Sequence, residues 1–421
     1  MADRLPERKG FTRRTVAKGA AALAAAAAAG AAGYYALSPK KGSGAAPRVR
    51  LVIGKDAARS VAVQWEGEGS GKLEFRPTGG PVQAFEPQKE ERRAYGMVFH
   101  LNSVRIAGLE PAATYEYRIP GIQGEWTSFK TAGEDKSSAL IFPDSQSTDH
   151  YATWRRLYQG ALSRNPDADF TVNMGDLVDC GAWMQHWEDW FAAVKGGIER
   201  VPFAPVMGNH DTYNENAHIG EPLVYLAAFA VPETGSRYWN RWYYTFDCGP
   251  VHYIVLNTQW READVFRKGL LPEMKTWFRE EAVKTEKPWT VVMMHRNAIH
   301  YNIKGRKATS DLFSAEGREL MPLFDEAGVD LVLTAHLHTY RNRGHIRGFK
   351  RDAKGPLYIL TGVAGNIRYP DFWIGNPLDK YVAPQPETDN YLRVDADAKQ
   401  LRVRCFLPDG TQIDESMLEK A

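Results

Sequence analysis

The pattern of hydrophobic and polar positions divides the chain into regions of different texture. Between residues 49 and 130, short apolar runs alternate with polar residues and turn residues, and no stretch keeps a helical period for long. About 85 residues of this kind predict a small all-β sandwich. Six runs are typical of strands: Val49–Ile53, Val61–Trp65, Lys72–Phe75, Met97–Val104, Thr114–Ile119 and Trp126–Lys130.

From Ser137 onward, strand-like runs alternate with runs of helical period, which predicts a layered α/β region. The predicted strands are Leu140–Phe142, Phe170–Met174, Phe203–Val206, Val291–Met294, Leu331–Leu333 and Leu357–Leu360. The predicted helices are Tyr151–Leu162, Trp183–Val194, Pro272–Lys284 and Ala315–Ala327. We expect Pro322 to break or shift the last helix, because proline removes an internal hydrogen bond. The runs Tyr391–Val394 and Leu401–Phe406 predict a hairpin that closes the sheet.

The first 32 residues read as a targeting segment. They hold six basic and two acidic side chains, and Arg13-Arg14 precedes an uncharged, alanine-rich stretch from Gly19 to Ala32. This pattern resembles a twin-arginine signal, which predicts export of the folded protein by that machinery to the periplasm, cell surface or medium. Residues 33–46 read as a linker. Membrane anchoring is expected only if the signal stays uncleaved.

Composition narrows the classes of partner. After the targeting segment is set aside, 47 basic side chains face 49 acidic ones. The remaining chain has no basic stripe with interleaved aromatics, and we therefore expect no nucleic-acid-binding surface. Candidate chemistry comes instead from polar clusters.

Asp, Asn and His residues follow several predicted strands directly. The clusters are Asp144-Ser145-Gln146, Gly175–Asp179, Gly208-Asn209-His210-Asp211, His295, Ala335–His338 and Gly362–Asn366. Carboxylate, amide and imidazole ligands along one sheet edge predict a site for two divalent metals. Asp176 is expected to bridge the two metals. Asp144 and Asn209 offer further oxygen ligands, and His295, His336 and His338 offer imidazole nitrogens. Mixed nitrogen and oxygen ligands suit zinc, manganese, iron or cobalt better than calcium.

Two such metals would supply a hydroxide that is nucleophilic at neutral pH and able to attack a phosphate ester. The leaving alkoxide then needs a proton, and His210 is placed to give it, with Asp211 expected to orient its ring. Arg296, beside His295, is a candidate contact for the substrate phosphate. The expected substrate is therefore a phosphate ester.

These clusters together resemble the five-block signature of the calcineurin-like metallophosphoesterases. The preceding sandwich and the His336-x-His338-x-Tyr340 continuation are most similar to the purple acid phosphatase branch. The resemblance implies Asp144, Asp176 and His338 on one metal, and it implies Asp176, Asn209, His295 and His336 on the other. It also implies a four-layer α/β/β/α domain over 137–415, preceded by a fibronectin III-like sandwich over 47–132 with a tyrosine corner near Leu109–Tyr117.

The chain departs from that family pattern at the first metal. Gln146 stands where the superfamily usually has His, and Asp179 stands where the purple branch has a metal-binding Tyr. Gln146 or Asp179 is expected to fill the vacancy, directly or through water. Without a tyrosinate ligand, the metal-loaded protein is expected to be colourless.

The sequence therefore predicts an exported phosphoric ester hydrolase that uses two divalent metals, with phosphomonoesters as the first expectation. A phosphodiesterase of the same fold is the alternative within this chemistry. A surface-associated binding protein with an inactive metal site is the alternative from another class.

Overall fold

The computed structural model describes residues 48–68 and 71–420. The predicted strands and helices of both regions are present, with ends shifted by a few residues. The predicted signal segment lies outside the described residues. Within the described part, no helix combines the length and apolarity needed to cross a membrane.

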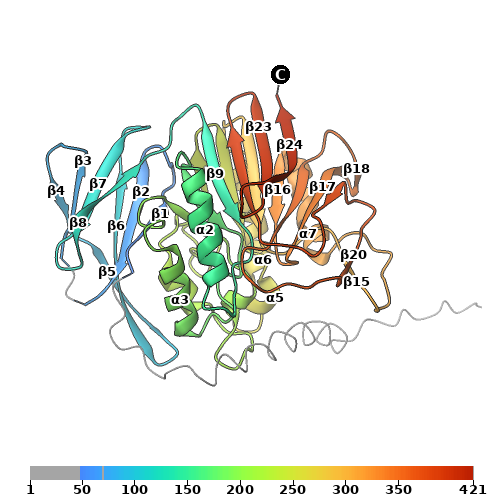
Figure 1. Ribbon diagram of the computed structural model, residues 1–421, viewed down its shortest axis with the longest axis horizontal. Coiled ribbons are helices and arrows are strands. Elements are labelled where there is room, and N and C mark those ends of the chain that lie inside the picture. Colours follow the sequence, from blue (N-terminus) through green and yellow to red (C-terminus); the bar gives the residue numbers. More distant parts are fainter. Residues whose placement is uncertain (1–47, 69–70, 421) are drawn as a thin grey trace, which may run out of the picture. The chain divides into compact units, whose positions relative to one another are not determined.

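A ten-stranded sheet joins the two predicted regions (Figure 1). Its order is β24-β23-β22-β9-β10-β11-β1-β2-β6-β5. The strands are β24 (Gln412–Glu419), β23 (Gln400–Phe406), β22 (Tyr391–Ala396), β9 (Ser137–Phe142), β10 (Phe170–Asn173), β11 (Phe203–Pro205), β1 (Arg50–Ile53), β2 (Ser60–Glu66), β6 (Met97–Ala107) and β5 (Gln88–Ala94). Strand β1 pairs in parallel with β11, with Val52 opposite Phe203. The N-terminal strands therefore extend the later sheet, and the proposed domain boundaries stay a prediction.

The predicted N-terminal sandwich is confirmed. A second, four-stranded sheet of β4 (Gln83–Phe85), β3 (Leu73–Pro77), β7 (Thr114–Ile119) and β8 (Gln123–Lys130) packs against β1, β2 and β6. Trp65, Phe75 and Tyr117 are buried between the two sheets. The backbone N–H of Glu110 donates to the Tyr115 hydroxyl at 2.9 Å, which is the expected tyrosine corner.

The eight-stranded sheet supplies the second half of the α/β region. Its main path is β12-β13-β14-β16-β19-β17-β18, and β21 pairs with β17. The strands are β12 (Tyr244–Cys248), β13 (Val251–Leu256), β14 (Trp289–Met294), β16 (Leu331–Thr334), β19 (Leu357–Gly362), β17 (Thr339–Arg347), β18 (Lys350–Arg351) and β21 (Tyr381–Val382). Phe170 of β10 packs edge-to-face on Phe246 and Tyr253, which shows that the two large sheets face each other.

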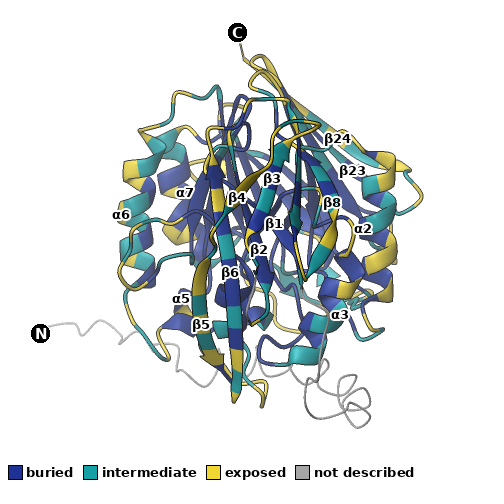
Figure 2. Cartoon of the chain, turned by 90° about the vertical axis from the view of Figure 1, so that its left-hand side faces the viewer, coloured by how far each residue is buried: buried dark blue, intermediate teal, exposed yellow. Residues whose placement is uncertain are grey.

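Helices cover the outer faces of these two sheets, and the predicted four-layer order is confirmed (Figure 2). On one side lie α2 (Ala152–Arg164) and α3 (Met184–Val194), and on the other lie α6 (Leu270–Ala282) and α7 (Ala315–Ala327). The remaining short elements are the 3₁₀ turn η1 (His210–Thr212), α4 (Leu223–Ala228), α5 (Trp260–Ala263), β15 (Asn302–Ile303) and β20 (Trp373–Ile374).

The expectation that Pro322 interrupts the last helix is wrong. Helix α7 runs unbroken from Ala315 to Ala327 with Pro322 inside it. The Ser314 side chain accepts from the Gly317 N–H at the start, and Gly328 ends the helix in a left-handed conformation. These caps, together with the burial of Met321 and Phe324, offset a proline cost of about 3 kcal/mol.

Candidate metal centre

The predicted ligands meet where strands of both large sheets end. Asp144 follows β9 and Asp176 follows β10, in the ten-stranded sheet. His295 follows β14, while His336 and His338 lie between β16 and β17, in the eight-stranded sheet. Because the carboxyl ends of parallel strands share one edge of a sheet, the hydrophobic runs carry these side chains to a common point.

One group of ligand atoms consists of Asp176, His295 and His336, all within 4.8 Å of one another. Nε2 of His295 lies 3.3 Å from Oδ2 of Asp176 and 3.2 Å from Nδ1 of His336. The same Nε2 lies 3.2 Å from Oδ1 of Asn209. All four predicted residues of this ligand set are therefore in one place.

A second group consists of Asp144, Asp176 and His338, again within 4.8 Å. Nε2 of His338 lies 3.5 Å from Oδ1 of Asp144. The other oxygen of Asp144 accepts from the His336 backbone N–H at 3.0 Å. Asp176 belongs to both groups, as expected of a carboxylate shared by two cations.

Hydrogen bonds to backbone carbonyls orient two of the imidazoles. Nδ1 of His295 lies 3.0 Å from the Met174 carbonyl oxygen, and Nδ1 of His338 lies 2.7 Å from that of Ile367. A carbonyl only accepts, so each Nδ1 carries the hydrogen and donates it. In a neutral ring, Nε2 then presents a lone pair toward the carboxylates. Lone pairs converging in a buried space fit a cation, and the donor set fits two.

Burial and neighbouring charges shift the pKa values of the ligands themselves. Burial raises the pKa of Asp176, but His295 and His210 outweigh it and hold that pKa well below its usual range. Burial holds the pKa of His336 well below its usual value, so this ring is neutral and keeps its lone pair. Burial lowers the pKa of His295, but the carboxylates of Asp176 and Asp144 raise it above its usual value. A cation bound at this group would therefore take the place of a proton on His295, and its binding should weaken as the pH falls.

The loops that carry the ligands adopt uncommon backbone conformations. Asp176, His336 and His338 have φ values of 50°, 80° and 51°. Residues other than glycine rarely adopt a positive φ, and those that do tend to mark functional sites. A Cβ atom on Gly175 would lie 2.5 Å from Nδ1 of His295, and only glycine allows this approach.

Gln146 is fully buried, and neither the oxygen nor the nitrogen of its side-chain amide has a hydrogen-bond partner among the described residues. Its backbone N–H donates to the Asp176 carbonyl at 3.1 Å. Within the described part of the chain, Oδ1 of Asp144 also has no hydrogen-bond partner, although Nε2 of His338 faces it at 3.5 Å. Buried polar atoms without partners are rare, and here they lie beside the second ligand group.

The structure gives His210 a different partner from the one expected. Its Nδ1 donates to the Asp179 carbonyl at 2.7 Å, and the Asp179 carboxylate lies 3.3 Å away. The carboxylate of Asp211, predicted to orient this ring, instead accepts backbone N–H groups of Leu177 and Gly208. Asp211 thus ties two ligand loops together. Burial lowers the pKa of His210, but Asp176, Tyr213 and Asp179 raise it well above its usual value.

The Arg296 side chain is held in place by polar contacts with two neighbouring side chains. Its Nε donates to the Gln259 side chain at 3.0 Å, and the guanidinium is also ion-paired with Glu262. Burial lowers the pKa of Arg296, but Glu262 and Glu316 raise it above its usual value. The guanidinium is therefore a fixed positive charge.

Two aromatic residues at the site were not predicted. The Tyr213 ring packs on His210 with centroids 4.6 Å apart, and its hydroxyl accepts from the Asn209 side-chain amide at 3.1 Å. The Tyr369 ring lies 5.0 Å from that of His338. Tyr213 stands only two residues after Asp211, which is a usable signal. Tyr369 lies just beyond the Gly362–Asn366 cluster that follows β19, but no spacing in the sequence marks it as a residue of the site.

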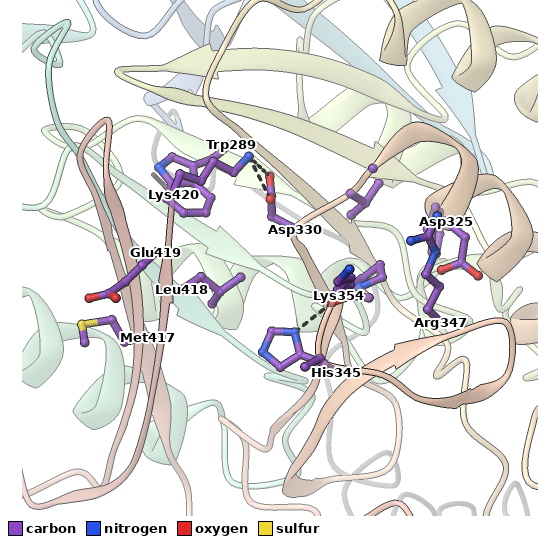
Figure 3. A pocket seen from close by; sticks show the side chains of 16 residues that line it. Trp289, Asp325, Asp330, His345, Arg347, Lys354, Met417, Leu418, Glu419 and Lys420 are labelled. Carbon is purple, nitrogen blue, oxygen red and sulfur yellow. Dashed lines mark hydrogen bonds and ion pairs between the residues drawn. The ribbon is translucent and has the colours of Figure 1, made fainter.

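A separate cavity of about 420 Å³ lies at the other end of the eight-stranded sheet (Figure 3). Trp289 begins β14 and Asp330 precedes β16, whereas the ligands follow these strands. Lys420 is ion-paired with Asp330 at 2.9 Å, and Nδ1 of His345 donates to the Gly355 carbonyl at 2.8 Å. Several polar groups lining this cavity are therefore already satisfied, and it does not form part of the metal centre.

Comparison with known proteins agrees with the motifs. Residues 139–340 match the family described as calcineurin-like phosphoesterase. Purple acid phosphatase 23 of Arabidopsis thaliana is 25% identical over 372 residues, which cover 76% of this chain and 75% of that protein. Purple acid phosphatase 21 of the same plant is 29% identical over 280 residues, 63% of this chain but only 58% of that protein.

The solved structure of purple acid phosphatase PPD1 from yellow lupin (Lupinus luteus) seeds has the same fold. It superposes with a TM-score of 0.70 at 17% sequence identity, and the match covers 89% of this chain and 74% of that one. The similarity spans both the sandwich and the α/β region.

Proposed function

We propose that the protein hydrolyses phosphate monoesters. The match of residues 139–340 to the calcineurin-like phosphoesterase family and the similarity to purple acid phosphatases support this proposal. The coarser activity, that of a metal-dependent phosphoesterase, follows from the family and from the two ligand groups. The observation that carries the proposal is that Asp176 belongs to both groups. A carboxylate shared in this way suits two cations held close together.

Asp144, Asp176 and His338 would hold one cation, and Asp176, Asn209, His295 and His336 the other. When bound, such a pair lowers the pKa of a coordinated water and offsets charge on the phosphoryl oxygens. The chain fixes the ligands in advance through the Met174 and Ile367 carbonyls. Arg296 is proposed to contact the phosphate as a charge held in place by Glu262.

His210 is proposed as the general acid, oriented by the Asp179 carbonyl. We expect His210→Ala to lower kcat about 100-fold for alkyl phosphates, which expel a basic alkoxide. The loss should be far smaller for p-nitrophenyl phosphate, whose leaving group needs no proton. Steady-state kinetics over a series of leaving groups measures the difference. An equal loss for every leaving group would remove His210 from this role.

Gln146 is proposed as an additional ligand of the cation held by Asp144 and His338, because its buried amide has no hydrogen-bond partner among the described residues. We expect Gln146→Leu to weaken binding of one cation by about 10- to 100-fold without loss of folding. Metal titration followed by elemental analysis measures this.

Gln64 provides the matched control for Gln146. Its amide is also buried, but it donates to the Ala227 carbonyl at 2.8 Å and accepts from the Ala230 N–H at 2.7 Å. Gln64→Leu should therefore destabilise the fold by about 1–3 kcal/mol and keep both cations. Full metal affinity in the Gln146 variant would exclude Gln146 as a ligand.

The proposed function is tested with p-nitrophenyl phosphate and its bis ester, on protein loaded in turn with zinc, manganese or iron. Metal-dependent release from the monoester supports the proposal. Faster release from the bis ester would favour the phosphodiesterase alternative. Two bound metals without hydrolysis of either compound would favour the inactive binding protein.

Export by the twin-arginine route remains a proposal that rests on the sequence of residues 1–32. Fusing residues 1–46 to a reporter tests it in a host that has this export system. Replacing Arg13-Arg14 with Lys-Lys is the matched control. Retention of the unaltered fusion in the cytosol contradicts the proposal.

A further inference from the structure

Four half-buried aromatic side chains adjoin the metal centre, and we call them the aromatic wall: Tyr301, Tyr369, Phe372 and Trp373. Tyr369 contacts the His338 ring at 5.0 Å between centroids. The Trp373 ring lies 6.0 Å from Tyr369 and 4.8 Å from Tyr301. The wall therefore starts at a proposed metal ligand and extends outward across two loops.

Backbone pairing joins the two loops that carry the wall. Strand β15 pairs with β20, with Ile303 opposite Trp373, and the two strands lie side by side in Figure 1. The Lys304 N–H donates to the Phe372 carbonyl at 2.9 Å. The Asn376 side chain donates to the His300 carbonyl at 3.0 Å. Segments about 70 residues apart in the chain thus form one surface.

Buried ion pairs anchor this surface to the eight-stranded sheet. Asp379, which follows the wall in sequence, is ion-paired with Arg341 and Arg343 of β17. Arg351 donates to the Leu378 carbonyl at 2.8 Å. A wall fixed in this way loses little conformational entropy when a ligand binds.

The loop beside the wall has a cationic tip. Lys304, Arg306 and Lys307 are exposed, and no ion pair to an acidic group occurs for them among the described residues. Burial raises the pKa of Tyr301, while Arg296 and Arg306 lower it, which places Arg306 within electrostatic range of the wall. Aromatic faces bordered by basic side chains are how proteins hold nucleotides without reading the base.

We propose that the aromatic wall stacks the base of a nucleoside phosphate whose phosphate lies at the metal centre. This inference rests on the proposed function and names its substrate class. The base packs on Trp373 and its neighbours, while the cationic tip attracts any further phosphate of the nucleotide. Alkyl and sugar phosphates occupy the metal centre but gain nothing from the wall.

The test compares adenosine 5′-monophosphate with ribose 5-phosphate, using the metal-loaded full chain. Both expel the same kind of primary alkoxide, so their ratio of kcat/KM reports the base and not the chemistry. We expect a ratio of about 10 in favour of the nucleotide, since stacking of one base contributes of that order. Trp373→Ala and Tyr301→Ala, on separate loops, should each lower this ratio severalfold.

Tyr238→Ala is the matched control, because Tyr238 is 53% exposed and belongs to neither loop of the wall. It should leave the ratio unchanged. A ratio near 1 in the unaltered protein, or one that neither wall variant changes, overturns the inference while the phosphatase activity stands.

Hydrolysis of neither compound, with two metals bound, contradicts the proposed function. In that case, titration calorimetry compares the binding affinities of the same two compounds and tests the aromatic wall independently of hydrolysis. Tighter binding of the nucleotide that is lost in Trp373→Ala supports the wall, and equal affinities overturn it.

Discussion

Asp176→Asn is expected to lower kcat/KM about 1,000-fold or more, because it weakens both metal sites at once. Asp176 belongs to both ligand groups, and an amide in its place supplies no negative charge between two cations. Metal ions contribute several kcal/mol to charge stabilisation in the transition state, and about 4 kcal/mol corresponds to that factor. Turnover of p-nitrophenyl phosphate and metal content by elemental analysis are measured together.

Asp169→Asn, at the other end of β10, is the control. Asp169 precedes β10, at the end opposite Asp176, and its carboxylate accepts from the Ser138 N–H at 2.8 Å. Burial raises the pKa of Asp169 to about 6. Folding therefore becomes less favourable as the pH rises from about 4 to about 6, and the control variant, which cannot ionise there, should be at least as stable as the parent at pH 8. Normal activity in both variants would remove Asp176 as a shared ligand.

The positions of the metal ligands were predictable from sequence because a local rule determines them. An apolar run such as Phe170–Met174 forms a buried strand, and the polar residue that follows it must lie at the sheet edge. His295 follows the same rule from the other sheet. The strand pattern therefore predicted the candidate ligands and the shared carboxylate, whereas their division into two groups followed from the resemblance to the phosphoesterases.

The partner of His210 could not be predicted in the same way. Asp211 is adjacent to His210 in sequence, whereas Asp179 is 31 residues away and ends another cluster, and both offer oxygen acceptors. Asp176 turns the chain with a φ of 50°, and the Asp179 carbonyl then meets the ring. The conformation of this loop depends on the folded structure, and no periodic pattern in the sequence predicts it.

Long-range pairing limited prediction at two other places. Strand β1 pairs with β11, about 150 residues later in the sequence, so strands of the sandwich belong to the same ten-stranded sheet as β9 and β10. Tyr301 and Trp373 meet only because β15 pairs with β20. Each strand has two residues, which is too short for a periodic pattern.

Removing the metals is expected to abolish hydrolysis and to lower the unfolding temperature by about 5 °C or more. A cation at 1,000 times its dissociation constant stabilises a protein by about 4.1 kcal/mol, and a large domain shifts by a few degrees per kcal/mol. Differential scanning calorimetry before chelation, after it, and after metal is restored measures the change. Asp176→Asn is the control, because a variant that binds little metal should respond little to the chelator.

The part of the protein that loses stability without the metals can be predicted from the sheets that carry the ligands. Asp144 and Asp176 come from one large sheet, whereas His295 and His338 come from the other, so the cations cross-link the two sheets. Without them, buried lone pairs face one another, and this end of the sheet pair should open first. Hydrogen exchange should therefore accelerate in residues 175–179 and 335–338, while β1 and β2 keep their protection. An unfolding temperature and an exchange pattern that ignore the chelator would show that the ligands do not hold metal across the sheets.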